Sequence, residues 1–243
     1  MGQRKQENIM NLTIKNIHKS FGNLKVLDDF SLELDKSRIH CFFGPSGCGK
    51  TTLMHVIAGI MKPDSGDIIM PPDMRFSYIF QEERLLPWKT VKENVALVLL
   101  DQKDEAYVES QVKDSLSLVE LNDFADYYPN ELSGGMRQRV SIARAFAYEG
   151  DVLAMDEPFK GLHLKLKQSL MEAIYKYWML HKPQTYFITH DIDDALYIAD
   201  DIYIFEGPPM RIVDKIEVQV PHELRKTNPE LLMAYKKKLS GVL

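Results

Sequence analysis

The sequence predicts an α/β fold: a mostly parallel sheet with helices packed against it and a helical segment inserted into it. An apolar, aromatic run at 39–43 reads as a buried strand, and a glycine-rich loop and a helix-like apolar stripe follow it. Strand and helix patterns then alternate over most of the chain, which is typical of parallel sheets. The exception is 83–149, where the patterns are helical throughout.

These patterns predict a single domain over 1–243. Its core would comprise 1–82 and 150–243, and 83–149 would be an inserted helical subdomain. Within the insertion we expect helices in "TVKENVALVLL", "YVESQVKDSLSLVEL" and the segment that starts at Ser133. The C-terminal "NPELLMAYKKKL" is typical of one amphipathic helix, and its basic run Lys236, Lys237 and Lys238 predicts a solvated face.

Composition excludes several classes of protein. The chain has 243 residues, 45% of them apolar, and a formal net charge of −5. Non-specific nucleic-acid binding usually needs a basic excess, so no nucleic-acid partner is expected. No apolar run reaches the roughly 18 residues of a membrane-spanning helix. Two cysteines, Cys41 and Cys48, make no disulfide framework and favour a reducing compartment.

The glycine-rich loop at 44–51 matches the phosphate-binding pattern G-x-x-x-x-G-K-[ST]. Its context fits, since a strand precedes it and a helix stripe of Leu53, Val56, Ile57 and Ile60 follows. Glycines let the backbone N–H groups point inward, and the helix N-terminus adds to their attraction for phosphate. The candidate nucleotide-binding residues here are Gly44, Pro45, Ser46, Gly47, Cys48, Gly49, Lys50, Thr51 and Thr52.

Two of these residues carry distinct chemistry. Lys50 can reach the outer phosphates as a point charge, and the Thr51 hydroxyl can ligate Mg²⁺. Cys48 has two interpretations: a thiol made reactive by the helix N-terminus, or a small side chain that merely fits, which we favour.

A pair of carboxylates ends the apolar run of "DVLAMDEP". In P-loop proteins a strand-end carboxylate holds the Mg²⁺ that the loop Ser or Thr also ligates, and Asp156 suits that role. Glu157 leaves the strand in a different direction and could activate water as a general base. The alternative is a solvated turn that carries two acids.

A second helix start, Ser133-Gly134-Gly135, offers another anion site. Ser133 is a good N-cap, and two glycines leave backbone N–H groups exposed. The helix that follows is basic, with Arg137, Arg139 and Arg144. Taken alone, it could equally be a capped core helix that binds nothing.

Together these motifs resemble the ATP-binding subunits of ABC transporters, over nearly the whole chain. "LSGGMRQR", from Leu132 to Arg139, is similar to the family's signature motif. The resemblance implies a P-loop NTPase (RecA-like) core with an antiparallel β part. It also implies a homodimer that sandwiches two ATPs, in which Ser133, Gly134 and Gly135 act on the ATP held by the other subunit's phosphate loop.

The resemblance assigns roles to three further residues. Phe21 matches the aromatic that stacks on adenine, although the sequence is equally consistent with an ordinary core phenylalanine. Gln81 matches the glutamine that senses Mg²⁺ and the attacking water. His190 matches the switch histidine at the γ-phosphate. Asp191 would then cap a helix whose inner face carries Ile192, Ala195, Leu196 and Ala199.

"QEERLLPWKTVKENVALVL" resembles the ATPases of bacterial importers for nitrate, sulfonate, taurine and thiamine-precursor pyrimidines. The implied partners are integral-membrane permease subunits and, indirectly, a periplasmic or lipid-anchored solute-binding protein. The protein is thus expected as a peripheral subunit at the cytoplasmic face of the cell membrane. Trp88, with Pro87 and Leu85, is the candidate permease contact; a tryptophan in the core of the helical subdomain is the alternative.

The expected function is hydrolysis of ATP, with Mg²⁺, to drive import of a small solute. The alternative is a nucleotide-sensing regulatory or non-transport ABC ATPase with weak hydrolysis, which a steady-state ATPase measurement would identify. Non-transport ABC ATPases of DNA maintenance or translation usually carry a long coiled-coil insertion or two tandem cassettes, and neither lies between Gly44 and Glu157. A small-molecule kinase would lack the signature motif.

One position departs from the family pattern. After the Glu-Pro the family usually closes with Leu-Asp, whereas this chain has Leu162-His163. The resemblance places that aspartate at the dimer interface, between the two ATP sites. Imidazole is larger and can be neutral or positive near neutral pH. We therefore expect reduced or pH-dependent cooperativity of hydrolysis; a tolerated variant is the alternative.

Overall fold

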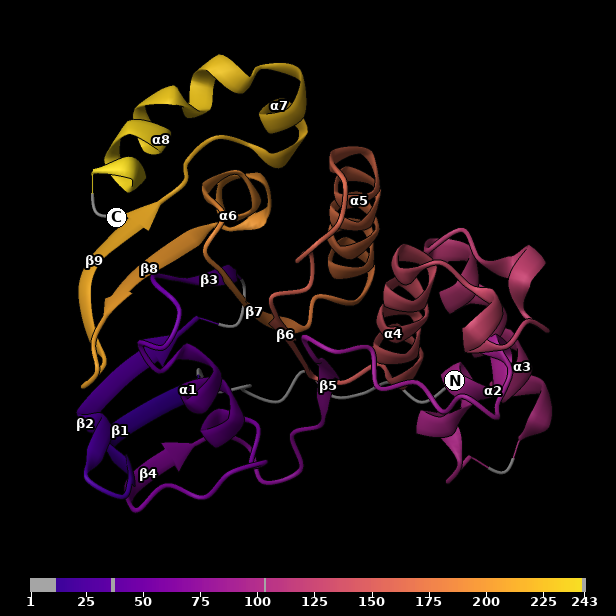
Figure 1. Cartoon of the computed structure of the whole chain (residues 1–243), viewed down its shortest axis with the longest axis horizontal. Coiled ribbons are helices and arrows are strands. Elements are labelled where there is room, and N and C mark those ends of the chain that lie inside the picture. The colour runs from indigo at the N-terminus through magenta and orange to yellow at the C-terminus, as the bar shows by residue number, and fades with distance from the viewer. Residues whose placement is uncertain (1–11, 36–37, 103, 242–243) are drawn as a thin grey trace. The chain divides into compact units, whose positions relative to one another are not determined.

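The computed structural model describes residues 12–35, 38–102 and 104–241 (Figure 1). The chain divides into two compact units. One comprises Met1–Met74 together with His190–Leu243, and the other comprises Arg75–Thr189. In the described part of the chain, no helix combines the length and apolar character that crossing a membrane requires.

The first unit begins with an antiparallel sheet of three strands in the order β2-β1-β4. Its strands are β1 (Leu12–Phe21), β2 (Leu24–Leu34) and β4 (Ser65–Ile69). Leu12 pairs with Leu34 and Ile14 with Leu32, and these four side chains are buried. This sheet is the antiparallel part that the sequence led us to expect.

The same unit contains a parallel pair of strands, β3 (Ile39–Phe43) and β8 (Asp201–Glu206). The strand β9 (Arg211–Glu217) lies antiparallel to β8. Every residue of β3 is buried, including the polar His40, as its mostly apolar, aromatic run predicts. Helix α1 (Lys50–Ile57) follows and buries Leu53, Val56 and Ile57. The inclusion of Ile60 in this stripe is wrong: Gly59, with φ +69°, lies just past the helix end, and Ile60 is 53% exposed.

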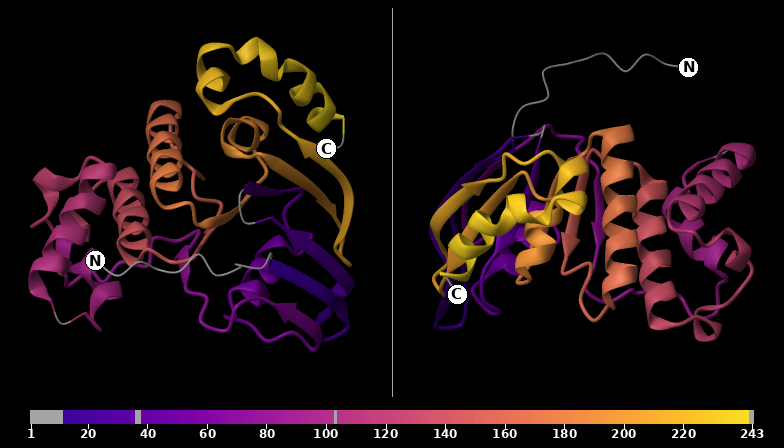
Figure 2. Two further views of the ribbon diagram at one scale, coloured as in Figure 1. Left: turned by 180° about the vertical axis from the view of Figure 1, so that it is seen from behind. Right: turned by 90° about the horizontal axis from the view of Figure 1, so that it is seen from above.

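Three helices and a 3₁₀ turn complete this unit: α6 (Ile192–Ile198), α7 (His222–Thr227), η4 (Pro229–Leu232) and α8 (Met233–Ser240). Both α7 and α8 pack on α6 (Figures 1 and 2). The C-terminal segment predicted as one helix begins with the 3₁₀ turn η4, which runs directly into α8. The basic run faces solvent as predicted, with Lys237 and Lys238 exposed; Lys236 also pairs with Asp193, and Lys238 Nζ lies 2.8 Å from Asp214.

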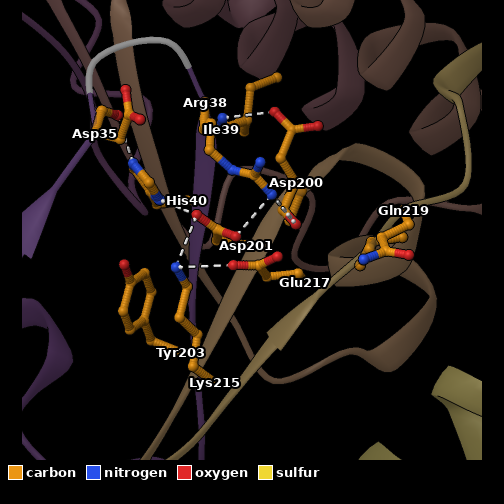
Figure 3. A network of polar contacts seen from close by, with 12 residues as sticks. Asp35, Arg38, Ile39, His40, Asp200, Asp201, Tyr203, Lys215, Glu217 and Gln219 are labelled. Carbon is orange, nitrogen blue, oxygen red and sulfur yellow. Dashed lines mark hydrogen bonds and ion pairs between the residues drawn. The ribbon is translucent and has the colours of Figure 1, made fainter.

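A buried polar network joins β3 to the start of β8 (Figure 3). Asp201, whose side chain is 1% exposed, receives a 2.8 Å hydrogen bond from Arg38 and lies 3.4 Å from His40 Nδ1 and 3.3 Å from Lys215 Nζ. Burial would raise the pKa of Asp201. Hydrogen bonds from His40 and Arg38, with the charges of Arg38 and Lys215, outweigh burial and lower that pKa to about 2.

The second unit contains the parallel strands β5 (Phe76–Ile79), β6 (Val152–Asp156) and β7 (Gln184–Thr189), with β6 between the other two. All residues of β6 and β7 are buried. Helix α5 (Leu164–His181) packs through one face, on which Leu170, Ile174 and Tyr177 are buried.

The rest of this unit is helical, in the order α2 (Val91–Ala96), η1 (Leu97–Leu99), α3 (Glu105–Leu118), η2 (Asn122–Phe124), η3 (Pro129–Glu131) and α4 (Gly134–Tyr148). Helices α2, α3 and α4 pack against one another (Figures 1 and 2). Buried Val95, Leu116 and Val140 lie in these helices. All six elements fall within 83–149; the boundaries of the inserted subdomain stay a prediction.

Candidate nucleotide-binding and hydrolysis site

In the first unit, the glycine-rich loop encloses the side chain of Lys50. Its Nζ donates to the Gly44 carbonyl at 2.8 Å and to the Pro45 carbonyl at 2.7 Å, and it lies 3.6 Å from Cys48 Sγ. Lys50 is only 5% exposed. A positive charge is thus held inside the loop at the N-terminus of α1, where anions are favoured.

Two glycines of the loop have no room for a side chain. A Cβ on Gly44 would lie 2.3 Å from the Phe205 carbonyl oxygen, and a Cβ on Gly49 would lie 2.9 Å from Val26 Cγ1. Gly49 also has φ +115°, which glycine adopts most readily. The loop therefore needs glycine at both positions, and its donor set fits a phosphate group.

The other loop residues differ in exposure. Thr51, in the first turn of α1, is exposed, as are Pro45, Ser46 and Gly47, whereas Thr52 is half-buried. Cys48 is fully buried. Burial favours the interpretation of Cys48 as a small residue that fits the loop over that of a reactive thiol.

Phe21 and His190 also belong to the first unit. Phe21 ends β1 and is 48% exposed, so it is not a core phenylalanine; Lys19 Nζ lies 5.8 Å from its ring centre. His190 is exposed and directly follows Thr189, the last residue of β7. Asp191 caps α6 as predicted, accepting hydrogen bonds from the N–H groups of Asp193 and Asp194.

In the second unit, the two acids differ in backbone conformation at the end of β6. Asp156 is the last residue of β6 and is 4% exposed. Glu157 turns away from the strand with φ +45°, a left-handed conformation that is uncommon for a non-glycine residue. Its N–H donates to the Ile188 carbonyl at 3.1 Å, which fixes its backbone to β7. Such conformations concentrate at functional sites.

The segment after Glu157 carries two basic side chains. Lys160 Nζ lies 2.9 Å from Glu157 Oε2. His163 is the N-cap of α5, and its Nδ1 accepts a hydrogen bond from the Leu166 N–H at 3.4 Å. The residue that departs from the family pattern therefore also begins a helix.

Gln81 is exposed and lies two residues after β5. Two side chains whose role the sequence did not indicate, those of Arg144 and Asn94, hold the segment that follows Gln81. Arg144, on α4, donates to the carbonyls of Arg84 and Glu83, each at 2.8 Å. Burial, and then the charge of Arg84, lower the pKa of Arg144 from its ordinary value.

Asn94, which is fully buried on α2, holds the loop that carries Trp88. It accepts a hydrogen bond from the Leu86 N–H at 2.8 Å and donates to the carbonyls of Leu86, Lys89 and Thr90. Trp88 is 69% exposed and so is not part of the core of the helical segment.

The serine-glycine-glycine segment starts α4 as predicted. The Ser133 hydroxyl accepts from the Met136 N–H at 3.3 Å, and Ser133 and Gly134 are exposed. A Cβ on Gly135 would lie 2.3 Å from Leu166 Cδ2, so glycine permits close packing there. Arg137 donates to the Leu132 carbonyl at 2.9 Å, and Arg139 to the Val119 carbonyl at 3.2 Å.

The predicted site residues fall into two groups, one on each unit. The loop at 44–52, Phe21 and His190 lie on the first. Gln81, Asp156, Glu157 and the segment at 133–135 lie on the second. Within the first group the structure brings Lys50 into the loop, and within the second it places Asp156 and Glu157 in succession at the end of β6.

Comparison with known proteins agrees with these motifs. Residues 27–160 match the ABC transporter family. The chain is 39% identical over 240 residues to the aliphatic sulfonates import ATP-binding protein of Bacillus cereus (strain ZK / E33L), covering 95% of this chain and 94% of the relative. It is 40% identical over 208 residues to the probable sulfate/thiosulfate import ATP-binding protein of Chlorella vulgaris, covering 82% and 88%.

The fold is also similar to that of solved structures. A dimeric post-hydrolysis ATP-binding cassette bound to ADP and phosphate superposes with a TM-score of 0.77 at 25% identity. The alignment covers 86% of this chain and all of the other.

Proposed function

The chain belongs to the ABC transporter family, and we propose that it is the ATP-binding and hydrolysing subunit of an importer for a small solute. The observation that supports this most is the buried Lys50 ammonium inside a loop that requires glycine at Gly44 and Gly49. A loop with inward N–H groups and one enclosed lysine is suited to the phosphates of a nucleotide.

The remaining loop residues and the aromatic complete the nucleotide site in this proposal. Phe21 stacks on the adenine, which its exposed ring permits. Thr51 and Asp156 ligate Mg²⁺, which typically binds one or two carboxylates plus substrate phosphates, and Gln81 senses the ion and the water. When bound, the ion neutralises charge on the phosphates. Ser133, Gly134 and Gly135 bind the ATP of a second copy.

Glu157 is the proposed general base, and His190 stabilises the γ-phosphate. Asp156 is the last residue of the strand, whereas Glu157 lies beyond it and has a left-handed φ, so the two side chains start from different backbone conformations. One carboxylate can thus serve the ion while the other orients water.

The proposed assembly is a homodimer, held by ATP, that attaches to integral-membrane permease subunits at the cytoplasmic face of the membrane. A solute-binding protein delivers the solute to the permease. The relatives named as import ATP-binding proteins support this assignment. Residues 83–149 act as the helical subdomain that carries the signature motif.

The permease contact in this proposal includes the exposed Trp88, with Pro87 and Leu85. Asn94 makes four hydrogen bonds to the backbone of 86–90, so Trp88 is presented on a fixed loop. A cavity of about 580 Å³ lies in the same unit; Ala96, Val108, Val112 and Leu116 line it, with Lys92 and Glu109 among the charged residues. An apolar cavity with a charged rim suits an amphipathic helix.

The substitution Glu157→Gln tests the hydrolytic role. We expect the variant to bind Mg-ATP but to hydrolyse it at least about a hundredfold more slowly, the contribution typical of a general base. It should also remain dimeric in ATP on a sizing column, whereas the parent returns to monomer. The matched control is Glu172→Gln, at an exposed position of α5. Parent-like hydrolysis by Glu157→Gln would refute the assignment.

Sulfonate- or sulfate-type anions are the cargo class that the relatives support, within the wider nitrate, sulfonate, taurine and pyrimidine group. Identifying the membrane protein that copurifies with the chain, then measuring uptake through it, tests this. A regulatory or non-transport ATPase with weak hydrolysis is the alternative, and the importer relatives do not favour it.

A further inference from the structure

Lys160 contacts the residue proposed as general base. Its Nζ lies 2.9 Å from Glu157 Oε2, and the side chains are 52% and 13% exposed. The lysine stem therefore reaches from the surface to a carboxylate that is mostly removed from water. None of the motifs used above assigns a role to Lys160.

The backbone holds the two side chains in this arrangement. The Lys160 N–H donates to the Glu157 carbonyl at 3.2 Å, closing a turn between the same two residues that form the ion pair. Gln138 fixes the turn from α4, since its side-chain amide donates to the Pro158 carbonyl at 2.9 Å. Phe159, within the turn, is 1% exposed and anchors it in the core.

We propose that Lys160 is a positioning residue that restrains Glu157 and thereby slows ATP hydrolysis. The inference rests on the proposed function, in which Glu157 is the base. A side chain that pairs with the general base of the same subunit determines how often the carboxylate of that base points toward the water. Lys160 would therefore set the turnover rate without contacting the nucleotide.

The chemical step shows why the pair opposes turnover. The water oxygen forms a bond to the γ-phosphorus while the bond from that phosphorus to the bridging oxygen of ADP breaks. The proton of the water passes to the Glu157 carboxylate, and ADP and phosphate leave. A carboxylate that gains a proton becomes neutral, so its attraction to the Lys160 ammonium is lost during the step. Binding of ATP precedes this loss and is not affected.

Steady-state hydrolysis by Lys160→Met tests the proposal, since methionine keeps most of the stem and removes the charge. We expect kcat to rise about two- to fivefold with KM unchanged, the range that corresponds to a partly exposed ion pair. Lys160→Arg should return kcat to the parent value, because it restores a positive charge. Lys165→Met, at an exposed lysine of α5, is the matched control and should leave both constants unchanged.

The outcomes separate this proposal from the function on which it rests. If parent hydrolysis depends on Glu157 but Lys160→Met has the parent kcat or a lower one, the restraint is refuted and the proposed function stands. If Glu157→Gln leaves the parent rate unaffected, both are refuted. A changed KM in Lys160→Met would also contradict the proposal, because it would indicate a role in binding.

Discussion

Arg225 Nη1 donates a 2.6 Å hydrogen bond to the carbonyl of Ala199, the residue at the C-terminal end of α6. The same nitrogen lies within hydrogen-bond distance of the Leu196 and Tyr197 carbonyls, so one guanidinium serves the carbonyls that a helix end leaves without intrahelical partners. Arg225 is 3% exposed, and Asp200 lies 3.7 Å from it. This side chain joins α7 to α6 in the unit that carries His190.

We predict that Arg225→Met lowers the free energy of unfolding by about 3–5 kcal/mol, the usual effect of removing one partner from a buried charged network. The carbonyls of α6 and the Asp200 carboxylate would lose a charged donor that water cannot replace in the interior. Urea unfolding followed by circular dichroism measures the change. Arg211→Met, at a side chain 73% exposed, should stay within about 0.5 kcal/mol of the parent. Equal midpoints for the two variants would contradict the prediction.

The lowered pKa of Asp201 predicts a pH dependence of stability. Because its folded pKa of about 2 lies below its ordinary value of 3.8, its ionised form stabilises the fold by about 2 kcal/mol above pH 4. This contribution is lost as the pH falls from about 4 to 2. Asp201→Asn should therefore be less stable than the parent at neutral pH.

Denaturant titrations of the parent and Asp201→Asn at several pH values check this. The difference in unfolding free energy should shrink as the pH falls toward 2. A difference that stays constant from neutral pH to pH 2 would show that charge on Asp201 is not its source.

Arg144 supports the segment after Gln81, so its removal should impair hydrolysis without altering the phosphate loop. We predict that Arg144→Met weakens the fold by about 1.5–3 kcal/mol, as expected for hydrogen bonds from a charged donor. Amide hydrogen exchange should quicken over 82–90, and kcat should fall. Arg139→Met, whose hydrogen bond goes to Val119 instead, is the comparison. Unchanged exchange over 82–90 in Arg144→Met would refute the supporting role.

His163→Asp tests the departure from the family pattern. Aspartate is a better N-cap than histidine, and its negative charge suits the N-terminus of α5, so we predict a gain in stability of about 0.5–1 kcal/mol. We also expect a higher Hill coefficient for ATP hydrolysis and a weaker dependence of rate on pH. His163→Asn separates capping from charge. If rate, cooperativity and pH profile all match the parent, inter-site coupling does not depend on this residue.

The parts of the fold that could be predicted are those that local sequence determines. The strand at 39–43 and the strand that ends at Asp156 are mostly apolar, and every residue in them is buried. The N-caps Ser133 and Asp191 were predictable because a short polar side chain before a helical stripe has few other uses. The glycine loop followed from its spacing, whereas the signature segment was identified through its resemblance to the ABC family.

The parts that could not be predicted depend on contacts between segments far apart in the sequence. Arginine is usually exposed, so nothing in the sequence near Arg225 indicates that it is buried against α6. Arg144 and Asn94 hydrogen-bond to backbone groups of 83–90, and these contacts form only in the folded chain. Lys160 differs, because its three-residue spacing from Glu157 is a detectable signal for a pair across a turn.

Because the backbone at Glu157 is left-handed, the residue that best suits stability at this position differs from the one that suits activity. Glycine adopts this conformation with less strain, so Glu157→Gly would relieve a backbone penalty of about 1 kcal/mol or more. It would also delete the carboxylate on which the proposed hydrolysis depends. A screen for thermal stability alone would therefore enrich inactive variants at this position.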